Sequence, residues 1–384
     1  MMKRRILIFI SHYLPGQNIG GPLNSVLNIV QNLKEDYEFF IITSNRDLGE
    51  ANNYENLLVN LWLDVKGAKV MYLNQGISYF YRVCKELRNC RYDVVYLNSL
   101  FDFKFSIYII ILNYFKFFQC SLLIVAPRGE LVNAALKFRK YKKKFFLKFA
   151  NSLGLYRKVI WHSTADFETC SIKKCISRSK VRFARVMANS EFNVVQVNNL
   201  SFDLDENFLK VVFLSRISKE KNLIYALKIL TKVSCRVEFH IYGPIEELNV
   251  WNECSELLKV MPENIRVKYG GIVQRDLVKS YFAQYDLFFF PTLIENYGHV
   301  INEALSVGTR VLISDNTPWR SLDSKGLGWD FNLKNENAFI RVLNEFHIYE
   351  GNEELNLRNK VKMSYHEFID KGKIYEENFN LFKP

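Results

Sequence analysis

Short apolar runs alternate with longer amphipathic runs along most of this chain, and this alternation limits the possible folds more than any other sequence feature. In the first half, helical patterns such as residues 22–34 and 77–89 separate the apolar runs. Apolar runs of Val, Ile, Leu and Phe with helices between them are typical of a parallel sheet covered by helices on both faces. We therefore expect strands at residues 4–11, 37–44, 68–73, 92–98, 121–127, 158–163 and 180–186.

The pattern stops in a polar stretch at residues 188–207 and then starts again, which predicts two domains. A chain of 384 residues is long enough for two packed cores. We expect two doubly wound α/β domains, at residues 1–195 and 208–366, with ligands beyond the carboxyl ends of their strands. A charged helical pattern without a following strand occupies residues 353–382. The second domain's expected strands lie at 210–214, 236–242, 265–268, 286–291 and 310–314.

The charge is distributed unevenly between the two halves of the chain. The net charge is +12, but residues 1–190 carry 29 Lys and Arg against 13 Asp and Glu, a net +16. The remaining residues carry 23 against 27, a net −4. A strongly basic half indicates an anionic surface as its partner, either a membrane or a nucleic acid.

The basic character is concentrated at residues 137–148, where lysines alternate with phenylalanines. A basic helix that carries aromatic side chains is typical of a helix lying in a membrane interface. The alternatives are a helix that packs its Phe and Leu side chains and exposes a solvated basic face, and a nucleic-acid patch. Because no nucleic-acid motif accompanies the stretch, we expect it to bind an anionic membrane surface and expect no nucleic acid.

Two further features bear on the location of the protein. Its seven cysteines form no Cys-x-x-Cys pair and no zinc-binding spacing, which favours buried, reduced thiols in the cytoplasm. The longest apolar run, residues 105–118, is interrupted by Asn113 and Lys116 and is shorter than the ~20 residues of a membrane-spanning helix. We therefore expect a protein peripheral to the inner face of the cytoplasmic membrane.

The clearest functional feature is residues 291–319, where an apolar strand leads into two glutamates, Glu295 and Glu303. Pro291 ends the strand, and Gly298 permits a close turn into a helix whose first amides can bind an anion such as a diphosphate. Glu303 follows about five residues into this helix, roughly 7–8 Å along its axis, where it suits the ribose hydroxyls of a nucleotide. Taken alone, such a pair of glutamates also arises by chance at helix starts.

Polar or turn-forming residues also follow the other strands of the second domain. Arg216 and Lys221 come after its first strand, where two cations can neutralise phosphate charge, although they could equally be a solvated pair. Gly243 and Pro244 end the next strand, and Tyr269 ends the one after. Successive strands that end in Gly, Pro or charge indicate a nucleotide-binding crevice.

These residues together resemble the family 4 retaining glycosyltransferases, which have the GT-B fold. The segment from Glu295 to Glu303 resembles the family's E-x7-E motif, and Arg216 and Lys221 resemble its phosphate-binding Arg-x4-Lys. Other counterparts are Gly20-Gly21-Pro22, Arg128-Gly129 and the segment from His162 to Glu168. The resemblance extends from about residue 12 to 330, across both expected domains.

The resemblance implies two Rossmann-like domains that face each other across a cleft, with a last helix near residues 367–384 that returns to the first, acceptor-binding domain. It also implies a nucleotide diphosphate sugar as donor, no cofactor and no metal. Glu295, Arg216 and Lys221 would be catalytic, with Glu295 at the donor sugar and the two cations at the diphosphate. The implied donor-binding residues are Glu303, Asn296, Tyr297, Gly298, His299, Val300, Gly243, Pro244 and Tyr269.

The sequence departs from the family in its first domain. Many members have a His-Gly pair after a first-domain strand, with the His at the donor sugar, whereas this chain has Arg128-Gly129. Arg128 could instead hold a phosphate of the donor or acceptor, or be an ordinary loop residue. We expect Gly20, Gly21, Arg128 and His162 to form an acceptor or phosphate loop, with a structural role as the alternative for His162.

The first hypothesis is therefore a hexosyltransferase of class EC 2.4 that transfers sugar from a nucleotide sugar, with UDP favoured. Its acceptor would be a lipid-linked saccharide for O-antigen, lipopolysaccharide, capsule or another surface polysaccharide. One alternative is an enzyme of the same fold that acts on a soluble sugar or sugar phosphate. Another is a basic, non-catalytic protein that binds membrane or nucleic acid.

Overall fold

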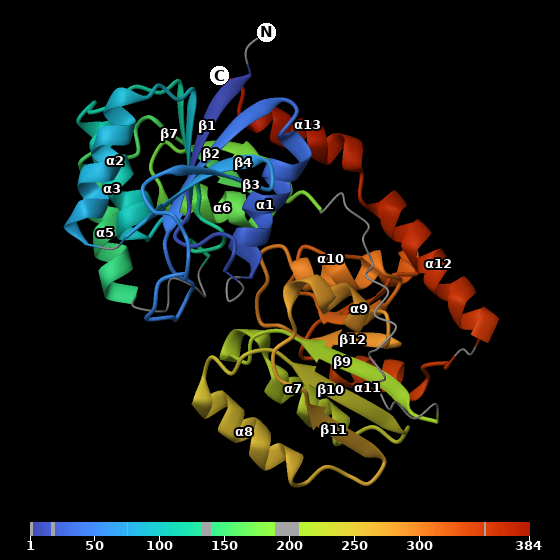
Figure 1. Ribbon diagram of the computed structural model, residues 1–384. Coiled ribbons are helices and arrows are strands. Elements are labelled where there is room, and N and C mark those ends of the chain that lie inside the picture. Colours follow the sequence, from blue (N-terminus) through green and yellow to red (C-terminus); the bar gives the residue numbers. More distant parts are fainter. Residues whose placement is uncertain (1–2, 17–19, 75, 133–139, 189–206, 349–350) are drawn as a thin grey trace. The chain divides into compact units, whose positions relative to one another are not determined.

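The computed structural model describes residues 3–16, 20–74, 76–132, 140–188, 207–348 and 351–384. The chain divides into two compact units, which are treated separately (Figure 1). Unit 1 comprises Met1–Glu191 and Lys371–Pro384, and unit 2 comprises Phe192–Asp370. The polar stretch expected to link the domains lies almost entirely outside the described residues.

Unit 1 is built on a sheet in the strand order β3-β4-β2-β1-β5-β6-β7-β8. Its strands are β1 Arg4–Phe9, β2 Tyr37–Ser44, β3 Trp62–Val65, β4 Ala68–Leu73, β5 Val94–Asn98, β6 Leu122–Ala126, β7 Val159–Ser163 and β8 Lys180–Phe183. Its helices are α1 Gly21–Leu33, α2 Ile77–Asn89, α3 Tyr108–Tyr114, α5 Lys140–Ser152, α6 Asp166–Cys175 and α13 Lys371–Leu381. The seven expected strands are present, and all pair in parallel.

The expectation of a wholly parallel first sheet is wrong at its edge, where β3 runs antiparallel to β4. The two strands are joined by Lys66 and Gly67, which have positive φ angles of 43° and 90°. A two-residue turn with both φ angles positive is the usual connection of a tight hairpin. Strand β3 is short and only partly buried, so its sequence lacks the continuous apolar run that predicted the other strands.

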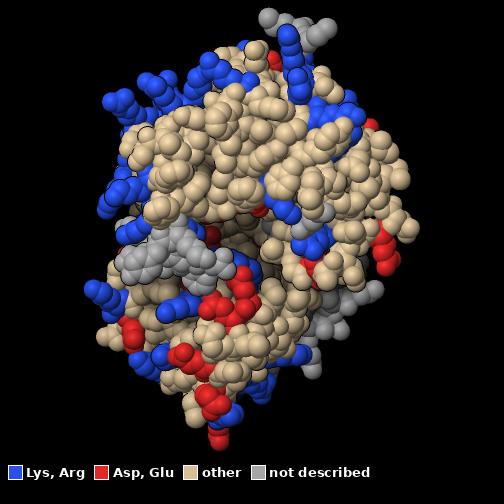
Figure 2. All heavy atoms as spheres, turned by 90° about the vertical axis from the view of Figure 1, so that its left-hand side faces the viewer, with Lys and Arg blue, Asp and Glu red and all other residues tan. Residues whose placement is uncertain are grey.

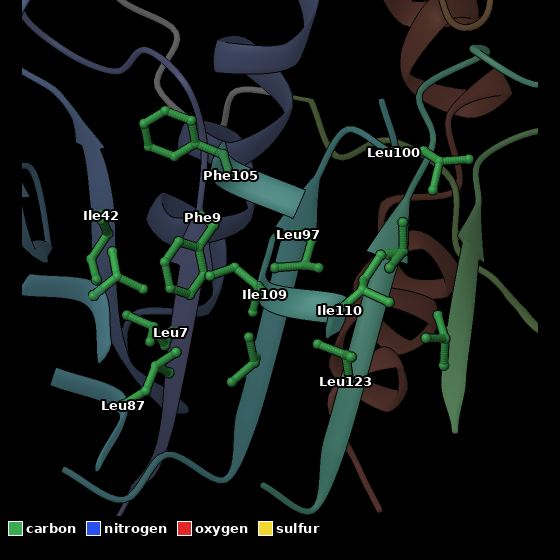
Figure 3. Packing of buried hydrophobic residues seen from close by; sticks show 14 of the residues in the cluster. Leu7, Phe9, Ile42, Leu87, Leu97, Leu100, Phe105, Ile109, Ile110 and Leu123 are labelled. Carbon is green, nitrogen blue, oxygen red and sulfur yellow. The ribbon is translucent and has the colours of Figure 1, made fainter. Parts of the chain in front are cut away.

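One buried hydrophobic cluster of unit 1 lies between the sheet and the helices α2, α3 and α5 (Figures 1 and 3). Leu7 and Leu97 of neighbouring strands contribute to the same fully buried cluster as Ile109 of α3 (Figure 3). Burial of such side chains stabilises the fold by about 1.5–3 kcal/mol each. The surface of the protein is charged where this cluster is apolar, and Lys and Arg side chains gather along the upper margin of the view in Figure 2.

Helix α13 packs on unit 1 although it comes from the end of the chain. The Tyr37 hydroxyl donates a hydrogen bond to the carbonyl oxygen of Phe379 at 2.8 Å. The guanidinium of Arg185 binds the Glu377 carboxylate at 2.9 Å. The expected return of the last helix to the first domain is therefore confirmed, with two helices, α12 and α13, in place of one continuous pattern.

Unit 2 is built on a wholly parallel sheet in the order β11-β10-β9-β12-β13-β14. Its strands are β9 Leu209–Leu214, β10 Val237–Tyr242, β11 Ile265–Tyr269, β12 Leu287–Phe290, β13 Arg310–Ser314 and β14 Gly328–Phe331. Its helices are α7 Leu223–Leu230, α8 Leu248–Leu258, α9 Val278–Phe282, α10 His299–Ser306, α11 Glu336–Asn344 and α12 Gly351–Phe368. The sequence analysis missed β14, which has only four residues and begins at a glycine.

Both sheets therefore have the expected doubly wound α/β architecture, and each has a point where the strand order changes direction. In unit 2 this switch point lies between β9 and β12, and in unit 1 it lies between β1 and β5. Ligands of such sheets bind beyond the carboxyl ends of the strands at a switch point. The loops that follow these four strands are therefore where the functional residues should be found.

Candidate active site

The loops after β9 and β12 are joined by hydrogen bonds at the switch point of unit 2. The backbone amide of Leu293 donates to the carbonyl oxygen of Glu220 at 2.8 Å, and the hydroxyl of Thr292 donates to the same oxygen at 3.0 Å. The side-chain amide of Asn222 donates to the carbonyl oxygen of Pro291 at 2.9 Å. These bonds hold the two loops together, and the predicted catalytic residues come from them: Arg216 and Lys221 from the loop after β9, and Glu295 from the loop after β12.

Lys221 and Glu295 form an ion pair in this position. The Lys221 Nζ lies 2.7 Å from the Glu295 Oε2, and the side chains are only 11% and 17% exposed. A charged hydrogen bond that is partly shielded from water is stronger than one at the surface. The structure thus brings together two residues that lie far apart in the sequence and had been assigned to the same site.

Gly298 sets the direction of the chain between Glu295 and helix α10. It has a φ of 83°, and a Cβ atom here would lie 2.8 Å from the Ile301 side chain and 3.2 Å from that of Glu295. The position therefore requires glycine for its backbone angle and for its space. Asn296, Tyr297, His299 and Val300 surround this turn at the start of α10, where the helix dipole favours an anion.

Glu303 lies one turn further into α10 and is half-buried. Burial raises the pKa of its carboxyl group to about 7, although the charges of Lys279 and Arg275 act in the opposite direction. Burial has this effect because it disfavours the charged form of a carboxylate. Glu303 is therefore poised between its neutral and ionised forms near physiological pH.

Arg216 also lies beyond β9, but its charge is matched by a carboxylate that the sequence analysis did not consider. Its Nη1 atom lies 2.6 and 2.8 Å from the two oxygens of Glu246, and both side chains are nearly half exposed. The partner follows Gly243 and Pro244 in the loop after β10. An anionic ligand of Arg216 would have to share this guanidinium with Glu246 or displace it.

The other strand ends predicted to bind the donor are packed closely together. Gly243 has a φ of 134°, and a Cβ atom there would meet the carbonyl oxygen of Ser215 at 2.0 Å. The hydroxyl of Tyr269 donates to the carbonyl oxygen of Gly243 at 2.9 Å. Pro244 accepts a hydrogen bond from the Ile217 amide at 2.8 Å. These contacts give Gly243, Pro244 and Tyr269 a structural role at the carboxyl edge of the sheet.

Three supporting residues of this site were missed. The Asn302 side-chain oxygen accepts hydrogen bonds from Tyr297 at 3.1 Å and from Tyr365 of α12 at 2.6 Å. The indole N–H of Trp319 donates to the carbonyl oxygen of Tyr297. Asn302 lies inside the Glu295–Glu303 segment and could have been noticed there, whereas Tyr365 has no local sequence signal.

Arg128 is the centre of a hydrogen-bonded chain at the carboxyl edge of unit 1. Its Nε donates to the Asn98 Oδ1 at 2.8 Å, and its Nη2 donates to the Tyr96 hydroxyl at 2.9 Å. Both acceptors are buried and uncharged. Arg128 also has a backbone φ of 52°, a conformation that residues other than glycine rarely adopt. The fold therefore holds this side chain in place, which fits both a phosphate-binding and a structural arginine.

The chain continues from Tyr96 into His162 and answers the question left open for that histidine. The Tyr96 hydroxyl lies 2.8 Å from the His162 Nδ1, and the His162 Nε2 lies 2.9 Å from the Ala184 carbonyl oxygen. The carbonyl requires a proton on Nε2, so Nδ1 accepts from Tyr96. Burial, aided by the charge of Arg128, lowers the pKa of His162 to about 3. The expectation of a ligand contact is corrected, because His162 is 1% exposed with both nitrogens engaged.

The glycine loop lies next to this chain. Gly20 precedes helix α1, which begins at Gly21, and Pro22 occupies its first turn. The side-chain amide of Asn98 donates to the carbonyl oxygen of Pro22 at 3.3 Å. Asn98 therefore connects the start of α1 with Arg128. The residues just before Gly20 are outside the described part of the chain.

The basic helix of the sequence analysis is α5, whose described part begins at Lys140. Leu147 and Ala150 are buried, whereas Phe145 and Phe149 are 74% and 54% exposed. The rings of Phe145 and Phe149 stack at a centroid distance of 6.5 Å. The alternative in which the phenylalanines pack into the core is therefore wrong for these two residues. Residues 137–139 lie outside the described range.

Three further expectations concern metals, membrane segments and cysteines. Within the described ranges, no three His, Cys, Asp or Glu side chains are placed to hold a metal ion. No described helix has the length and apolarity needed to cross a bilayer. All seven cysteines are free, but the expectation that they are buried holds only for Cys254, since Cys170 is exposed and the other five are partly buried.

Solved structures with similar folds define the class of this protein. HepE from Anabaena, solved in complex with UDP-glucose, matches with a TM-score of 0.72 and 16% identity over 98% of each chain. WaaG, a glycosyltransferase involved in lipopolysaccharide biosynthesis, matches with a TM-score of 0.64 and 12% identity over 98% of this chain and 99% of its own. The fold is therefore GT-B, as found in glycosyltransferases.

The sequence comparison identifies the family within that class. Residues 209–345 match the family described as "Glycosyl transferases group 1". This segment, which contains the six strands of unit 2 together with Lys221 and Glu295, is a group 1 glycosyltransferase domain, and its activity is the transfer of a sugar from a nucleotide sugar. This match decides against the non-catalytic alternative. A Klebsiella pneumoniae protein, described as an uncharacterized 41.2 kDa protein in the cps region, is 22% identical over 281 residues, or 72% of this chain and 75% of its own.

Proposed function

We propose that this protein is a retaining hexosyltransferase that uses a UDP-sugar and extends a lipid-linked saccharide of a bacterial surface polysaccharide. The carrying observation is the Lys221–Glu295 ion pair next to the start of α10, at the switch point of unit 2. The UDP preference is supported by HepE, which binds UDP-glucose. The acceptor class is supported by the cps-region relative and by WaaG.

Each site residue has a defined task in this proposal. The start of α10 and the cations Lys221 and Arg216 hold the diphosphate, because both present positive charge beyond the strand ends. The Glu303 carboxylate accepts hydrogen bonds from the ribose hydroxyls of the nucleotide. Glu295 accepts hydrogen bonds from hydroxyls of the donor sugar through the carboxylate oxygen that is not bound to Lys221. The tie between Glu295 and Lys221 keeps sugar and diphosphate in a fixed relative position.

The reaction exchanges one bond at the anomeric carbon. The bond from this carbon to the diphosphate oxygen breaks, and the acceptor hydroxyl oxygen bonds to the same carbon from the same face. The acceptor proton ends on the released diphosphate. Negative charge grows on the diphosphate and positive charge on the sugar during this exchange. Lys221 and Arg216 stabilise the negative charge on the diphosphate, and the Glu295 carboxylate stabilises the positive charge on the sugar.

Arg128 is proposed to bind a phosphate of the acceptor or donor in place of the histidine of related enzymes. Its two hydrogen-bond acceptors are neutral, so its positive charge is oriented without being cancelled. Burial of Tyr96 and Asn98 prevents the guanidinium from swinging away. A charged donor fixed in this way binds an anion without the entropy cost of ordering a flexible side chain.

Helix α5 is proposed to hold the enzyme on the anionic inner face of the cytoplasmic membrane. Exposed Lys144 and Lys148 alternate with exposed Phe145 and Phe149, as is typical of interfacial helices. Each cation near an anionic leaflet contributes about 1 kcal/mol. Changing Lys144 and Lys148 to Glu should therefore reduce sedimentation with anionic vesicles and leave transfer to a soluble acceptor intact.

A donor screen followed by a transfer assay tests the proposal. A UDP-sugar should raise the melting temperature more than the matching GDP- and ADP-sugars, because a ligand stabilises the folded state in proportion to ln(1 + [L]/Kd). Transfer should then be measured to lipid-linked saccharides and to short soluble sugars. Preference for GDP- or ADP-sugars would overturn the donor assignment. Equal activity on free sugars would favour the soluble-acceptor alternative.

A further inference from the structure

The starts of the parallel strands in unit 1 form an edge that lies opposite the edge carrying Arg128. Strands β1, β5, β6, β7 and β8 are consecutive in the sheet and parallel. Residues at or just before their starts therefore lie in one row, although they are scattered over the sequence. The cations in this row, here called the basic edge, are Lys3, Arg4, Arg5, Arg91, Lys116, Arg157, Lys158, Arg178 and Lys180.

Acids are few on the basic edge, although Glu35 and Glu38, at the start of the neighbouring strand β2, lie 3.6 Å from the Lys3 Nζ and 3.8 Å from the Arg5 Nε. Asp93 is the one acidic residue in the five sequence segments that precede or begin these strands, and its Oδ2 accepts a hydrogen bond from the Arg5 amide at 2.8 Å. Figure 2 shows Lys and Arg side chains along the upper margin of the view, with few acidic side chains among them. Such a concentration of one charge attracts an extended anionic surface.

A pocket of about 620 Å³ opens within this edge. Four cations, Lys3, Arg4, Arg5 and Arg91, line it together with one carboxylate, that of Asp93. The guanidinium of Arg5 lies 4.9 Å from the centre of the Tyr92 ring and donates to the Arg91 carbonyl oxygen at 3.0 Å, so it shapes the pocket wall. Among the described residues no carboxylate pairs with Arg4 or Arg91. Their charges are thus available to a phosphate group.

An exposed aromatic loop adjoins the pocket in the sequence. Tyr114, Phe115 and Phe117 are 44%, 73% and 39% exposed, and Lys116 lies among them. The next residue, Phe118, is 6% exposed and anchors the loop in the core just before the pocket residues 119–121. Aromatic side chains beside cations are the usual composition of a surface that enters a membrane interface.

We propose that the basic edge docks on an anionic lipid bilayer, with a headgroup phosphate in the pocket and the 114–117 loop in the interface. The inference rests on the proposed membrane association and deepens it by naming a second surface and its lipid chemistry. Exposed Leu153 joins this surface at the end of α5, in line with Phe145 and Phe149. Leu153 can enter an apolar layer but cannot stack on a nucleic-acid base, which favours lipid over nucleic acid.

This docking surface has a consequence for the acceptor. The two edges of the unit 1 sheet are separated by the length of a strand, about 17 Å for five residues. With the basic edge on the lipid, the Arg128 edge stands away from the bilayer by at least this length. A lipid-linked acceptor must then bridge that length with sugars it already carries.

Vesicle sedimentation with charge-reversal variants tests the docking surface. The variant Arg91→Glu, Lys116→Glu, Lys158→Glu changes three exposed loop residues of the basic edge. Its affinity for vesicles containing phosphatidylglycerol should fall at least about tenfold, since each cation contributes separately. The matched control Lys268→Glu, Lys334→Glu, Lys360→Glu changes three exposed lysines of unit 2 and should bind as the wild type does. Vesicles of phosphatidylcholine alone should bind both variants and the wild type only weakly, through the aromatic loop.

A second variant tests the aromatic loop. Phe115→Ser with Phe117→Ser should remove the part of the binding that persists at 1 M salt, where the Debye length is about 3 Å. Both loop side chains are exposed, so the variant should keep the melting temperature of the wild type. Its binding at low salt should be weakened less than that of the triple charge variant.

The outcomes separate this inference from the proposed function. Loss of binding in the triple variant, with transfer to a soluble acceptor retained, supports it. If the triple variant binds vesicles as the wild type does, while the Lys144→Glu, Lys148→Glu variant loses vesicle binding, docking by the basic edge is overturned and α5 is the membrane contact. Release of wild-type protein from vesicles by millimolar inorganic phosphate would assign the pocket to free phosphate. Tighter binding to single-stranded DNA than to vesicles would also overturn the lipid assignment. If the donor screen fails while edge docking holds, the proposed transfer reaction alone is wrong.

Discussion

Arginine stands beyond the strand ends of both sheets, and the partners of these two arginines differ. Arg128 of unit 1 donates to the neutral oxygens of Asn98 and Tyr96, and no described carboxylate pairs with it. Arg216 of unit 2 is bound by both oxygens of Glu246, and the neighbouring Lys221 is bound by Glu295. The first arrangement orients a positive charge, and the second orients positive charges and neutralises them.

The difference teaches how each site would receive an anion. A phosphate reaching Arg128 meets an uncompensated charge that the fold has already positioned. A diphosphate reaching Arg216 and Lys221 must replace or share their carboxylates, so part of the attraction is offset. The second arrangement suits a product that must leave after each turnover, because the carboxylates regain their partners when the nucleotide departs.

The largest expected effect breaks the unit 2 pair at its carboxylate. Glu295→Ala should lower kcat by about 10²–10³, the typical loss when one group that stabilises transition-state charge is removed. The affinity for UDP should not fall, because Lys221 loses its competing partner. Steady-state kinetics and titration calorimetry measure the two quantities. An unchanged kcat would remove Glu295 from the catalytic residues.

The next effect tests whether the charge of Arg128 is used. Arg128→Ala should raise KM for the phosphate-bearing substrate by about 10- to 100-fold, since a charged hydrogen bond contributes about 1.5–3 kcal/mol. Tyr96→Phe removes one support and leaves the charge, so it should raise KM to a smaller extent without a matching loss of kcat. If both variants keep the wild-type KM, Arg128 has a structural role only.

Glu303 allows a pH test of the nucleotide site. Its pKa is raised to about 7, so the carboxylate is mostly neutral at pH 6 and mostly ionised at pH 8. The ionised carboxylate accepts hydrogen bonds from the ribose hydroxyls more strongly than the neutral carboxyl group does. The UDP affinity should therefore increase with pH, by at most about tenfold over this range. The raised pKa also means that the contribution of Glu303 to folding stability decreases as the pH rises from its ordinary pKa of 4.5 towards 7.

The control for this pH dependence is Glu303→Gln, which cannot ionise. Titration calorimetry of this variant should give a UDP affinity that varies with pH only through the nucleotide itself. A wild-type profile identical to that of Glu303→Gln would show that Glu303 does not contact the ribose.

The smallest effect concerns Glu246, the competitor for Arg216. Glu246→Gln should tighten UDP binding by no more than about fivefold, because an exposed ion pair contributes only about 0–1 kcal/mol. Glu256→Gln is a suitable control, since it removes an exposed ion pair with Lys259 elsewhere in unit 2. Weaker UDP binding in Glu246→Gln would mean that Glu246 positions Arg216 for the ligand.

Much of the fold was predictable because parallel strands buried on both faces carry a continuous apolar signal. Strands β2 and β13 and helix α2 have the expected bounds. Strands β3 and β14 were missed because each has four residues and several are only partly buried. The Glu295–Glu303 segment was recognisable because a strand end, a glycine turn and a helix start leave a local pattern.

The partners of the site residues were not predictable in the same way. Glu246 lies 30 residues from Arg216, and Tyr96 lies 66 residues from His162, with no spacing rule that connects them. His162 looked like a site residue because it ends a strand. Only the packing of β7 against β8 shows that both of its nitrogens are occupied.

The sequence by itself determined the two α/β domains, the excess of positive charge in the first and the family of the second. Those properties depend on composition and on local patterns. The tertiary structure alone decided that no carboxylate in the described part of the chain pairs with Arg128, that Arg216 and Lys221 are paired, and that nine dispersed cations form one edge. The reason is physical: the energy of a charge depends on its distance to other charges, and that distance follows from strand order instead of chain order.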